Sequence, residues 1–236
     1  IYGQTKGTGT IKVDGGSGKA GIRVAKGSTL NIKGGSIYAY GTQGGAGIGG
    51  DNEESSGKIE ILGGTVTAEG GRCGAGIGGG KFYGDGGTTI IHGGTIIATG
   101  GVDAAGIGGG SNGDAPLGPD GGSGGNIIIN GGTITATAGS SSAEAIGRGM
   151  YGRNAGTKQI TGGNIKGYSN HTIILDGVNE EVSIVDINCN YGINDVMTLD
   201  KDKLYFYISD TEYKKLTEIT VRDKTGKEDT YYKTED

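Results

Sequence analysis

Apolar and polar residues alternate over short stretches of this chain, and a pair of glycines divides many of these stretches. In the segment KIEILGGTVTAE, residues 58–69, Ile59 and Ile61 alternate with charged residues before the glycines. After the glycines, Val66 and Ala68 alternate with threonines. A period of two residues is typical of a β-strand with one face toward a core, and no window has a convincing helical period. The pattern therefore predicts an all-β fold.

The same strand–corner–strand unit recurs five times along the chain. Its Gly-Gly pairs begin at positions 34, 63, 93, 131 and 162, which gives steps of 29, 30, 38 and 31 residues. A second motif, of the type AGIGGG, keeps the same rhythm, with its isoleucine at positions 22, 48, 77, 107 and 146. A propeller blade needs about 40 residues with hairpin turns, whereas short strands at this period are typical of a solenoid. The repeat therefore predicts a right-handed parallel β-helix with coils of about 30 residues.

Composition agrees with a narrow solenoid. Glycine occupies 56 of the 236 positions, while phenylalanine occurs 2 times and tryptophan 0 times. The core must therefore consist of isoleucine, valine, leucine, alanine and glycine. We expect positive φ at the Gly-Gly corners, because glycine adopts it without steric cost. The glycine runs repeat in every coil and no G-x-x-x-x-G-K-[ST] motif occurs, so we assign the glycines to backbone geometry rather than to phosphate binding.

The glycines thin out after about residue 170, and the pattern changes. Residues 1–19 fit a partial first coil, and the segments HTIILDG and EEVSIVDINCNYGI fit the strands of a terminal coil. The later segments LYFYIS, TEITVRD and DTYYKT are aromatic and alternating, and charged turns join them. We therefore predict a β-helix with its terminal coils over residues 1–195. Residues 196–236 are predicted to form a small antiparallel β-hairpin module or the start of a next domain.

Charge and hydropathy restrict the partners. The formal net charge is −5 and there is no basic stripe, so we expect no nucleic-acid partner. No run of about 18 apolar residues occurs, so we expect no membrane insertion.

Cys73 and Cys189 lie in unrelated contexts and define neither a disulfide framework nor a metal site, so we expect two free thiols. The chain begins with isoleucine and has no visible signal peptide, and we expect it to be a piece of a longer protein.

Four loops that follow the AGIGGG motif vary in length and composition. They are residues 50–57, 80–87, 110–125 and 149–156. Loops at equivalent repeat positions stack along one edge of a solenoid, and we call this predicted edge the loop rim. Aromatic faces beside carboxylates and amides suit sugar stacking and hydrogen bonding. The alternative is that these are solvated loops with an occasional packed aromatic ring. The candidate ligand-binding residues are Asp51, Asn52, Glu53, Phe82, Tyr83, Asp85, Asn112, Asp114, Asp120, Tyr151 and Arg153.

The sequence contains no complete motif for metal binding or for catalysis. The loop oxygens near Asp51 and between Asn112 and Asp120 suit Ca²⁺. Their spacing matches neither an EF-hand nor a nonapeptide calcium array, so we predict no metal site and no cofactor, with calcium as the alternative. A polysaccharide lyase or hydrolase needs acidic residues gathered on one face, and the outward strand positions carry no such cluster. We therefore predict no catalytic residues, and a binding function is favoured over an enzyme.

Three further features of the sequence are a lone histidine, an acid–base pair and a column of threonines. His92 precedes a Gly-Gly corner and is predicted to be an exposed bystander. Glu144 and Arg148 interrupt the small-residue motif and are interpreted as a structural ion pair. A Thr-x-Thr column is similar to that of ice-binding β-helices, but Tyr38 and Ile97 break it, so ice binding stays an alternative.

The tandem units I-x-I-x-G-G-T-[IV]-x-A, interleaved with AGIGGG, resemble the glycine-rich repeats of large cell-surface and secreted proteins of Gram-positive gut anaerobes. They also resemble the NGGTI-type repeats of bacterial carbohydrate-binding β-helix domains of the pectin-lyase-like superfold. The resemblance covers about residues 20–168 and is specific for architecture, because a fold does not fix a function. It implies an extracellular protein, secreted or attached to the cell surface. No lyase motif is present, and no site residue follows from the resemblance.

The sequence thus predicts an extracellular bacterial binding or adhesion module whose loop rim recognises a glycan or a host surface component. The alternatives are a non-binding stalk or spacer, a polysaccharide-degrading lyase or hydrolase, and an ice-binding protein. Because an uncapped β-helix end exposes strand edges, we expect either a monomer or end-to-end association.

Overall fold

The computed structural model describes residues 1, 9–113, 121–166, 171–176, 182–187, 197–200, 203–208, 218–223 and 227–232. The chain divides into two compact units, residues 1–168 and residues 169–236. The regular elements of the described residues are β-strands, which confirms the all-β fold class. The described residues include no helix with the length and apolar character needed to cross a membrane.

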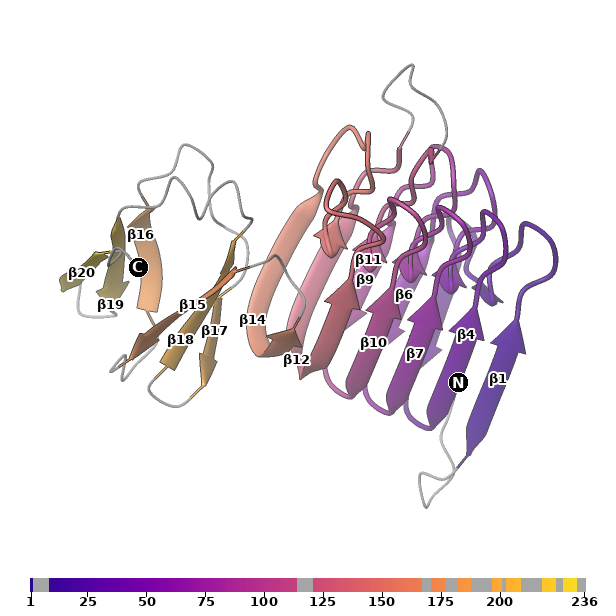
Figure 1. The fold of residues 1–236 in the computed structure, drawn as a ribbon. Helices are drawn as coiled ribbons and strands as arrows, with labels where there is room; N and C mark the ends of the chain where they lie inside the picture. Colours follow the sequence, from indigo (N-terminus) through magenta and orange to yellow (C-terminus); the bar gives the residue numbers. More distant parts are fainter. Residues whose placement is uncertain are drawn as a thin grey trace. The chain divides into compact units, whose positions relative to one another are not determined.

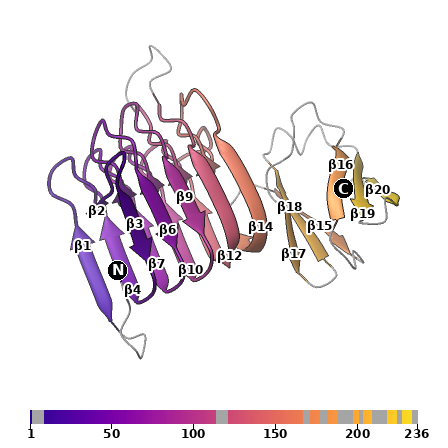
Figure 2. The same cartoon turned by 180° about the vertical axis from the view of Figure 1, so that it is seen from behind.

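The described residues of the first unit form a right-handed parallel β-helix with three faces (Figures 1 and 2). The first face contains β3 (Thr29–Ile32), β6 (Lys58–Ile61), β9 (Thr88–Ile91) and the first parts of β12 (Asn126–Thr137) and β14 (Thr157–Lys166). The second face contains β1 (Thr10–Asp14), β4 (Ser36–Tyr40), β7 (Thr65–Glu69), β10 (Thr95–Thr99) and the second parts of β12 and β14. The third face contains β2 (Ile22–Arg23), β5 (Ile48–Gly49), β8 (Ile77–Gly78), β11 (Ile107–Gly108) and β13 (Ile146–Gly147). These strands pair in parallel with their equivalents one coil away.

Successive coils are stacked in register, so equivalent residues form columns. On the third face, Ile48 pairs with Ile77, and Ile77 pairs with Ile107. These three side chains are fully buried. The inward positions of β6 and β7 are buried and the outward ones are half-buried or exposed, as the two-residue period predicts. Because each fully buried isoleucine contributes about 1.5–3 kcal/mol, the columns supply the main stabilisation of the solenoid.

The Gly-Gly pairs form the corners between the first and second faces. The second glycine of the pair has a φ of 88° at Gly35, 94° at Gly64 and 98° at Gly94. A Cβ atom at Gly64 would lie 2.5 Å from the backbone oxygen of Gly35, so the stacked coils leave no room for a side chain. The expected positive φ at these corners is confirmed. Glycine is required there for two reasons, the left-handed backbone and the close approach of the neighbouring coil.

One core column contains a polar residue. Thr89 pairs with Ile59 in the coil before it and with Ile127 in the coil after it, and its side chain is buried like theirs. Its hydroxyl oxygen makes no hydrogen bond within the described residues. A buried hydroxyl without a partner destabilises a protein, because it has lost its hydrogen bonds to water.

We expect Thr89→Val to stabilise the β-helix by about 1 kcal/mol, because valine has nearly the same shape and no hydroxyl to desolvate. Urea unfolding followed by circular dichroism measures the change in the free energy of unfolding. Thr88→Val is the matched control, since Thr88 faces outward on the same strand and should change little. A loss of stability in Thr89→Val would show that the hydroxyl has a partner after all.

The last coil of the β-helix carries charges in core columns. Lys158 of β14 pairs with Ile127 of β12, and its side chain is 3% exposed. Glu144 stands two residues before Ile146, the place that Ala105 has before Ile107 in the preceding coil. The ammonium of Lys158 lies 2.9 Å from one carboxylate oxygen of Glu144, and Nε of Arg148 lies 3.3 Å from the other. The interpretation of Glu144 and Arg148 as a structural pair is confirmed, with Lys158 as an additional member.

The described strands of the second unit pair antiparallel. Strand β18 (Lys203–Ile208) pairs with β15 (His171–Asp176) and with β17 (Met197–Asp200). Strand β19 (Glu218–Asp223) pairs with β16 (Val182–Ile187) and with β20 (Glu228–Tyr232). The sequence predicts that β15 and β16 belong to a terminal coil that ends at residue 195, whereas the division in the structure falls after residue 168. The reason is that β15 and β16 pair antiparallel with strands that follow them in the chain.

Candidate functional site: the loop rim

The four variable loops stack on one another at one edge of the β-helix (Figure 1). The amide of Glu53 donates to the carbonyl of Lys81 at 2.7 Å, and the amide of Phe82 donates to the carbonyl of Ser111 at 3.1 Å. Farther along, the amide of Gly124 donates to the carbonyl of Asn154 at 2.9 Å. Backbone hydrogen bonds therefore connect each loop with the next, and the loop rim is one continuous surface over the described residues.

The carboxylate of Asp51 is used inside the fold. It is buried, and one oxygen accepts a hydrogen bond from the amide of Ala20 at 2.8 Å. The other oxygen lies 2.9 Å from the ammonium of Lys19 and 3.3 Å from Nε of Arg23. Both cations belong to the preceding coil. Asp51 thus joins two coils. The two cations lie about one coil before Asp51 in the sequence, but this spacing indicates a contact only once the register of the coils is known.

Glu54 reinforces the same junction. Its carboxylate accepts two hydrogen bonds from Arg23, at 2.8 Å from Nε and 2.6 Å from Nη2. The hydrogen bond from Arg23 lowers the pKa of Glu54 below its ordinary value, against a smaller opposing effect of burial. The same hydrogen bond raises the pKa of Arg23. A fork of this kind fixes the geometry of both side chains, so this acid is structural.

The remaining polar candidates divide between surface and interior. Asn52 donates to the carboxylate of Glu53 at 3.2 Å on the surface of the first loop. Asp85 accepts from the amide of Ser123 at 2.8 Å and so links the second and third loops. Asn112 is 1% exposed, and its side-chain oxygen and nitrogen make no hydrogen bond within the described residues. Asp114 and Asp120 lie outside the described residues.

Two of the aromatic candidates are exposed on the loop rim. Tyr83 is 54% exposed and Tyr151 is 47% exposed. The guanidinium carbon of Arg153 lies 5.8 Å from the ring centre of Tyr83, and the ammonium of Lys81 lies 4.3 Å from that of Phe82. Both are within reach of a cation–π interaction. The loops therefore bring together two of the predicted residues, Tyr83 and Arg153, from different coils.

Several of these side chains stand on an unusual backbone. The φ angle is 56° at Phe82, 52° at Tyr83 and 62° at Tyr151, and it is 65° at Glu53. A left-handed conformation is uncommon for any residue other than glycine and is an outlier for a bulky one. Each such residue costs about 1–3 kcal/mol, and such strain concentrates at functional sites. Gln43, Cys73 and Asp103, which lie outside the loop rim, also have positive φ angles of 49°, 68° and 60°, so left-handed residues mark the tight turns of the coils in general.

A second polar cluster, away from the loop rim, was missed at the sequence level. Glu60 lies 3.2 Å from Nε2 of His92 and 3.2 Å from the ammonium of Lys58. Nδ1 of His92 lies 3.4 Å from the amide nitrogen of Asn130. The hydrogen bond with His92, and next that with Lys58, lowers the pKa of Glu60. His92 is exposed as expected, but it takes part in an interaction between coils and is not a bystander. The sequence signal for this contact was the separation of Glu60 and His92 by 32 residues, which is one coil plus two residues.

The described residues hold no group of three or more histidine, cysteine, aspartate or glutamate side chains arranged for a metal ion. Cys73 is a buried thiol in the loop before the third AGIGGG motif. Cys189 lies outside the described residues.

Comparison with known proteins agrees with the architecture. The family model described as the beta helix repeat matches residues 30–52, 59–81 and 90–111. Each match begins within a strand of the first face. It continues through the Gly-Gly corner and the AGIGGG motif and ends in a loop of the loop rim. Searches of curated proteins and of solved structures found no match. Over these residues the chain is similar to the beta helix repeat, in agreement with the β-helix of the structure.

Proposed function

We propose that this β-helix repeat protein is an extracellular binding or adhesion module that recognises a glycan, or a glycan-bearing host surface component, through the loop rim. The observation that carries the proposal is that Tyr83 and Tyr151 are exposed on stacked loops and held at positive φ. A rigid scaffold that presents variable loops is the usual setting for binding sites. The extracellular location rests on the resemblance of the repeats to those of cell-surface proteins.

The chemistry of the two tyrosines suits a sugar. A tyrosine ring offers an apolar face for the C–H surface of a pyranose and a hydroxyl for a hydrogen bond. Arg153 beside Tyr83 adds a planar donor next to that ring. Because the backbone of both tyrosines is fixed by the stacked loops, little conformational entropy is lost when a ligand binds.

Glycan-array binding followed by calorimetry with a soluble fragment of the best ligand tests this proposal. We expect Tyr83→Ala/Tyr151→Ala to weaken binding at least about tenfold, which corresponds to 1.4 kcal/mol. Tyr38→Ala is the matched control, because Tyr38 is an exposed tyrosine on β4 and not on the loop rim. Tyr83→Gly guards against misfolding, since glycine keeps the positive φ while the ring is removed. Equal affinity of the double variant and the wild type would refute the loop-rim site.

The second candidate is a stalk that holds another domain away from the cell. It is favoured by the observation that Asp51, Glu54 and Asp85 are engaged within the fold, which leaves fewer polar groups for a ligand. A stalk predicts no binding to any glycan on the array. It also predicts that the loop-rim variants have no effect on attachment to host cells.

A further inference from the structure

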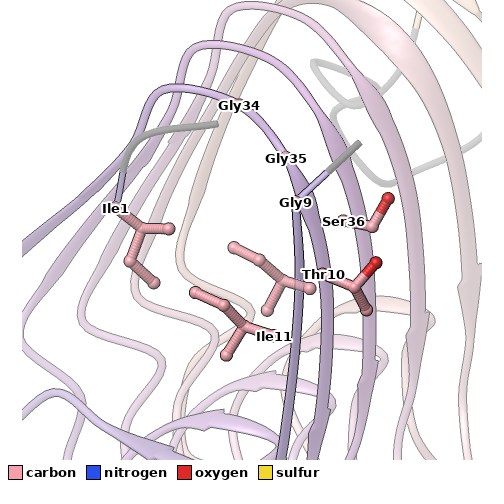
Figure 3. A pocket seen from close by; sticks show the side chains of 8 residues that line it. Ile1, Gly9, Thr10, Ile11, Gly34, Gly35 and Ser36 are labelled. Carbon is pink, nitrogen blue, oxygen red and sulfur yellow. The ribbon is translucent and has the colours of Figure 1, made fainter. Parts of the chain in front are cut away.

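The corners between the first and second faces differ in the residue that precedes the Gly-Gly pair. Figure 3 shows the first of these corners at Gly34 and Gly35. In chain order, the preceding residues are Lys33, Leu62, His92, Asn130 and Thr161. Asn130 is the only amide among them, and it is followed directly by Gly131. One corner of the β-helix therefore contains the sequence Asn-Gly.

The Asn-Gly pair at this corner is accessible and only loosely restrained. In an Asn-Gly pair the backbone amide can approach the side-chain amide closely, because glycine has no Cβ atom to hinder it. Asn130 is exposed and Gly131 is half-buried. The pairing of β12 with β14 passes from Asn130 to Thr133, and its pairing with β9 ends at Ile129. Gly131 thus falls in a gap of the ladders that the described strands form.

His92 lies beside the side-chain amide of Asn130. Nδ1 of its ring is 3.4 Å from Nδ2 of Asn130, while Nε2 is 3.2 Å from one carboxylate oxygen of Glu60. The other oxygen of Glu60 lies 3.2 Å from the ammonium of Lys58. When the imidazole carries both protons, Nε2–H donates to Glu60 and Nδ1–H points at the amide nitrogen of Asn130. Histidine changes its charge in the neutral range, so it can deliver a proton to this nitrogen.

We propose that Asn130–Gly131 is a self-modification site, at which the folded chain converts the Asn130 amide into a carboxylate with His92 as the proton donor. The backbone nitrogen of Gly131 attacks the side-chain carbonyl carbon of Asn130 and loses its proton to water. The bond between that carbon and Nδ2 breaks, and Nδ2 leaves as ammonia with a proton from Nδ1 of His92. Water then opens the resulting succinimide, which gives an aspartate or an isoaspartate with a lengthened main chain.

The product aspartate fits the corner. A carboxylate at position 130 faces Nδ1 of His92, and a charge-assisted hydrogen bond is stronger than the contact of the neutral amide. An isoaspartate would lengthen the main chain at a crowded place, since a Cβ atom at Gly131 would already lie 2.7 Å from the backbone oxygen of His92. We therefore expect aspartate as the main product in the folded chain. The reaction leaves a row of Glu60, His92 and the new carboxylate across three coils, away from the loop rim.

Incubation of the full chain in heavy-oxygen water, followed by peptide mass spectrometry, measures the conversion. The sequence has one other Asn-Gly pair, Asn112–Gly113, which is the internal control because Asn112 is 1% exposed. We expect Asn130 of the folded chain to convert at least about tenfold faster than Asn112, since a buried group reacts only through local opening. In urea the two pairs should convert at similar rates. Conversion of Asn130 no faster than that of Asn112 in the folded chain would overturn the proposal.

Variants of the two partners test the proton donor. His92→Gln should slow the conversion of Asn130 in the folded chain at least about tenfold and leave the rate in urea unchanged, since glutamine has no proton to deliver. Glu60→Gln keeps an acceptor for Nε2 of His92 and should retain most of the rate, whereas Glu60→Ala should lose it. Circular dichroism checks that each variant is folded. An unchanged rate in folded His92→Gln would contradict the role of His92, and an unchanged rate in Glu60→Ala would contradict the positioning of the ring by Glu60.

Discussion

Gly78→Ala is expected to unfold the β-helix or to destabilise it by about 4 kcal/mol or more. Gly78 has a φ of 138°, and an added Cβ atom would lie 1.9 Å from the backbone oxygen of Gly108 in the next coil. Rotation of a side chain cannot relieve this contact, because the Cβ atom is fixed to the backbone of residue 78 and the oxygen belongs to the backbone of Gly108. The same geometry recurs at Gly49 and Gly108, so the substitution opposes the spacing on which all the coils depend. Urea unfolding followed by circular dichroism measures the loss.

Two other glycines serve as graded controls. Gly27 has a φ of 86° but open space around it, so Gly27→Ala should cost about 1 kcal/mol, from the left-handed backbone alone. Gly16 has neither constraint, and its nearest neighbour atom is 3.9 Å away, so Gly16→Ala should be neutral or stabilise slightly. If Gly78→Ala were no worse than Gly27→Ala, the close stacking of the third face would be wrong.

The second large effect is expected at the last coil. Glu144→Ala should destabilise the β-helix by about 3 kcal/mol, because the nearly buried ammonium of Lys158 loses the carboxylate at 2.9 Å. The double variant Glu144→Ala/Lys158→Ile introduces the residue types of Ala105 and Ile127 in the preceding coil. It should be as stable as the wild type or more stable, since apolar packing replaces a buried ion pair. Thermal and urea unfolding of the three proteins measure the differences.

Arg148→Ala is the matched control for this pair. The side chain of Arg148 is 50% exposed and lies 3.3 Å from Glu144, so its loss should cost less than about 1 kcal/mol. A double variant less stable than Glu144→Ala alone would show that the charges are needed at this end. In that case the ion pair would act as a cap of the core rather than as a replaceable pair.

Most of the candidate site could be located from the sequence, but its chemistry could not. The unequal loops indicated a rim, and Tyr83 and Tyr151 are indeed on its surface. Asp51 appeared equally available in the sequence, yet it is buried against Lys19 and Arg23 of the preceding coil. Which polar side chains face a ligand depends on contacts between coils, and these have no local signature.

The sequence by itself determined the architecture of this protein. The period of two and the spacing of the Gly-Gly pairs are enough to define parallel coils, because a strand exposes one face to the core and a corner with positive φ requires glycine. The tertiary structure decided which side chains meet across coils, such as Glu60 with His92 and Tyr83 with Arg153. It also decided that β15 and β16 belong to the second unit. The physical reason is that a period describes one coil, whereas an ion pair, a ring contact or an antiparallel pair joins residues that are neighbours only in space.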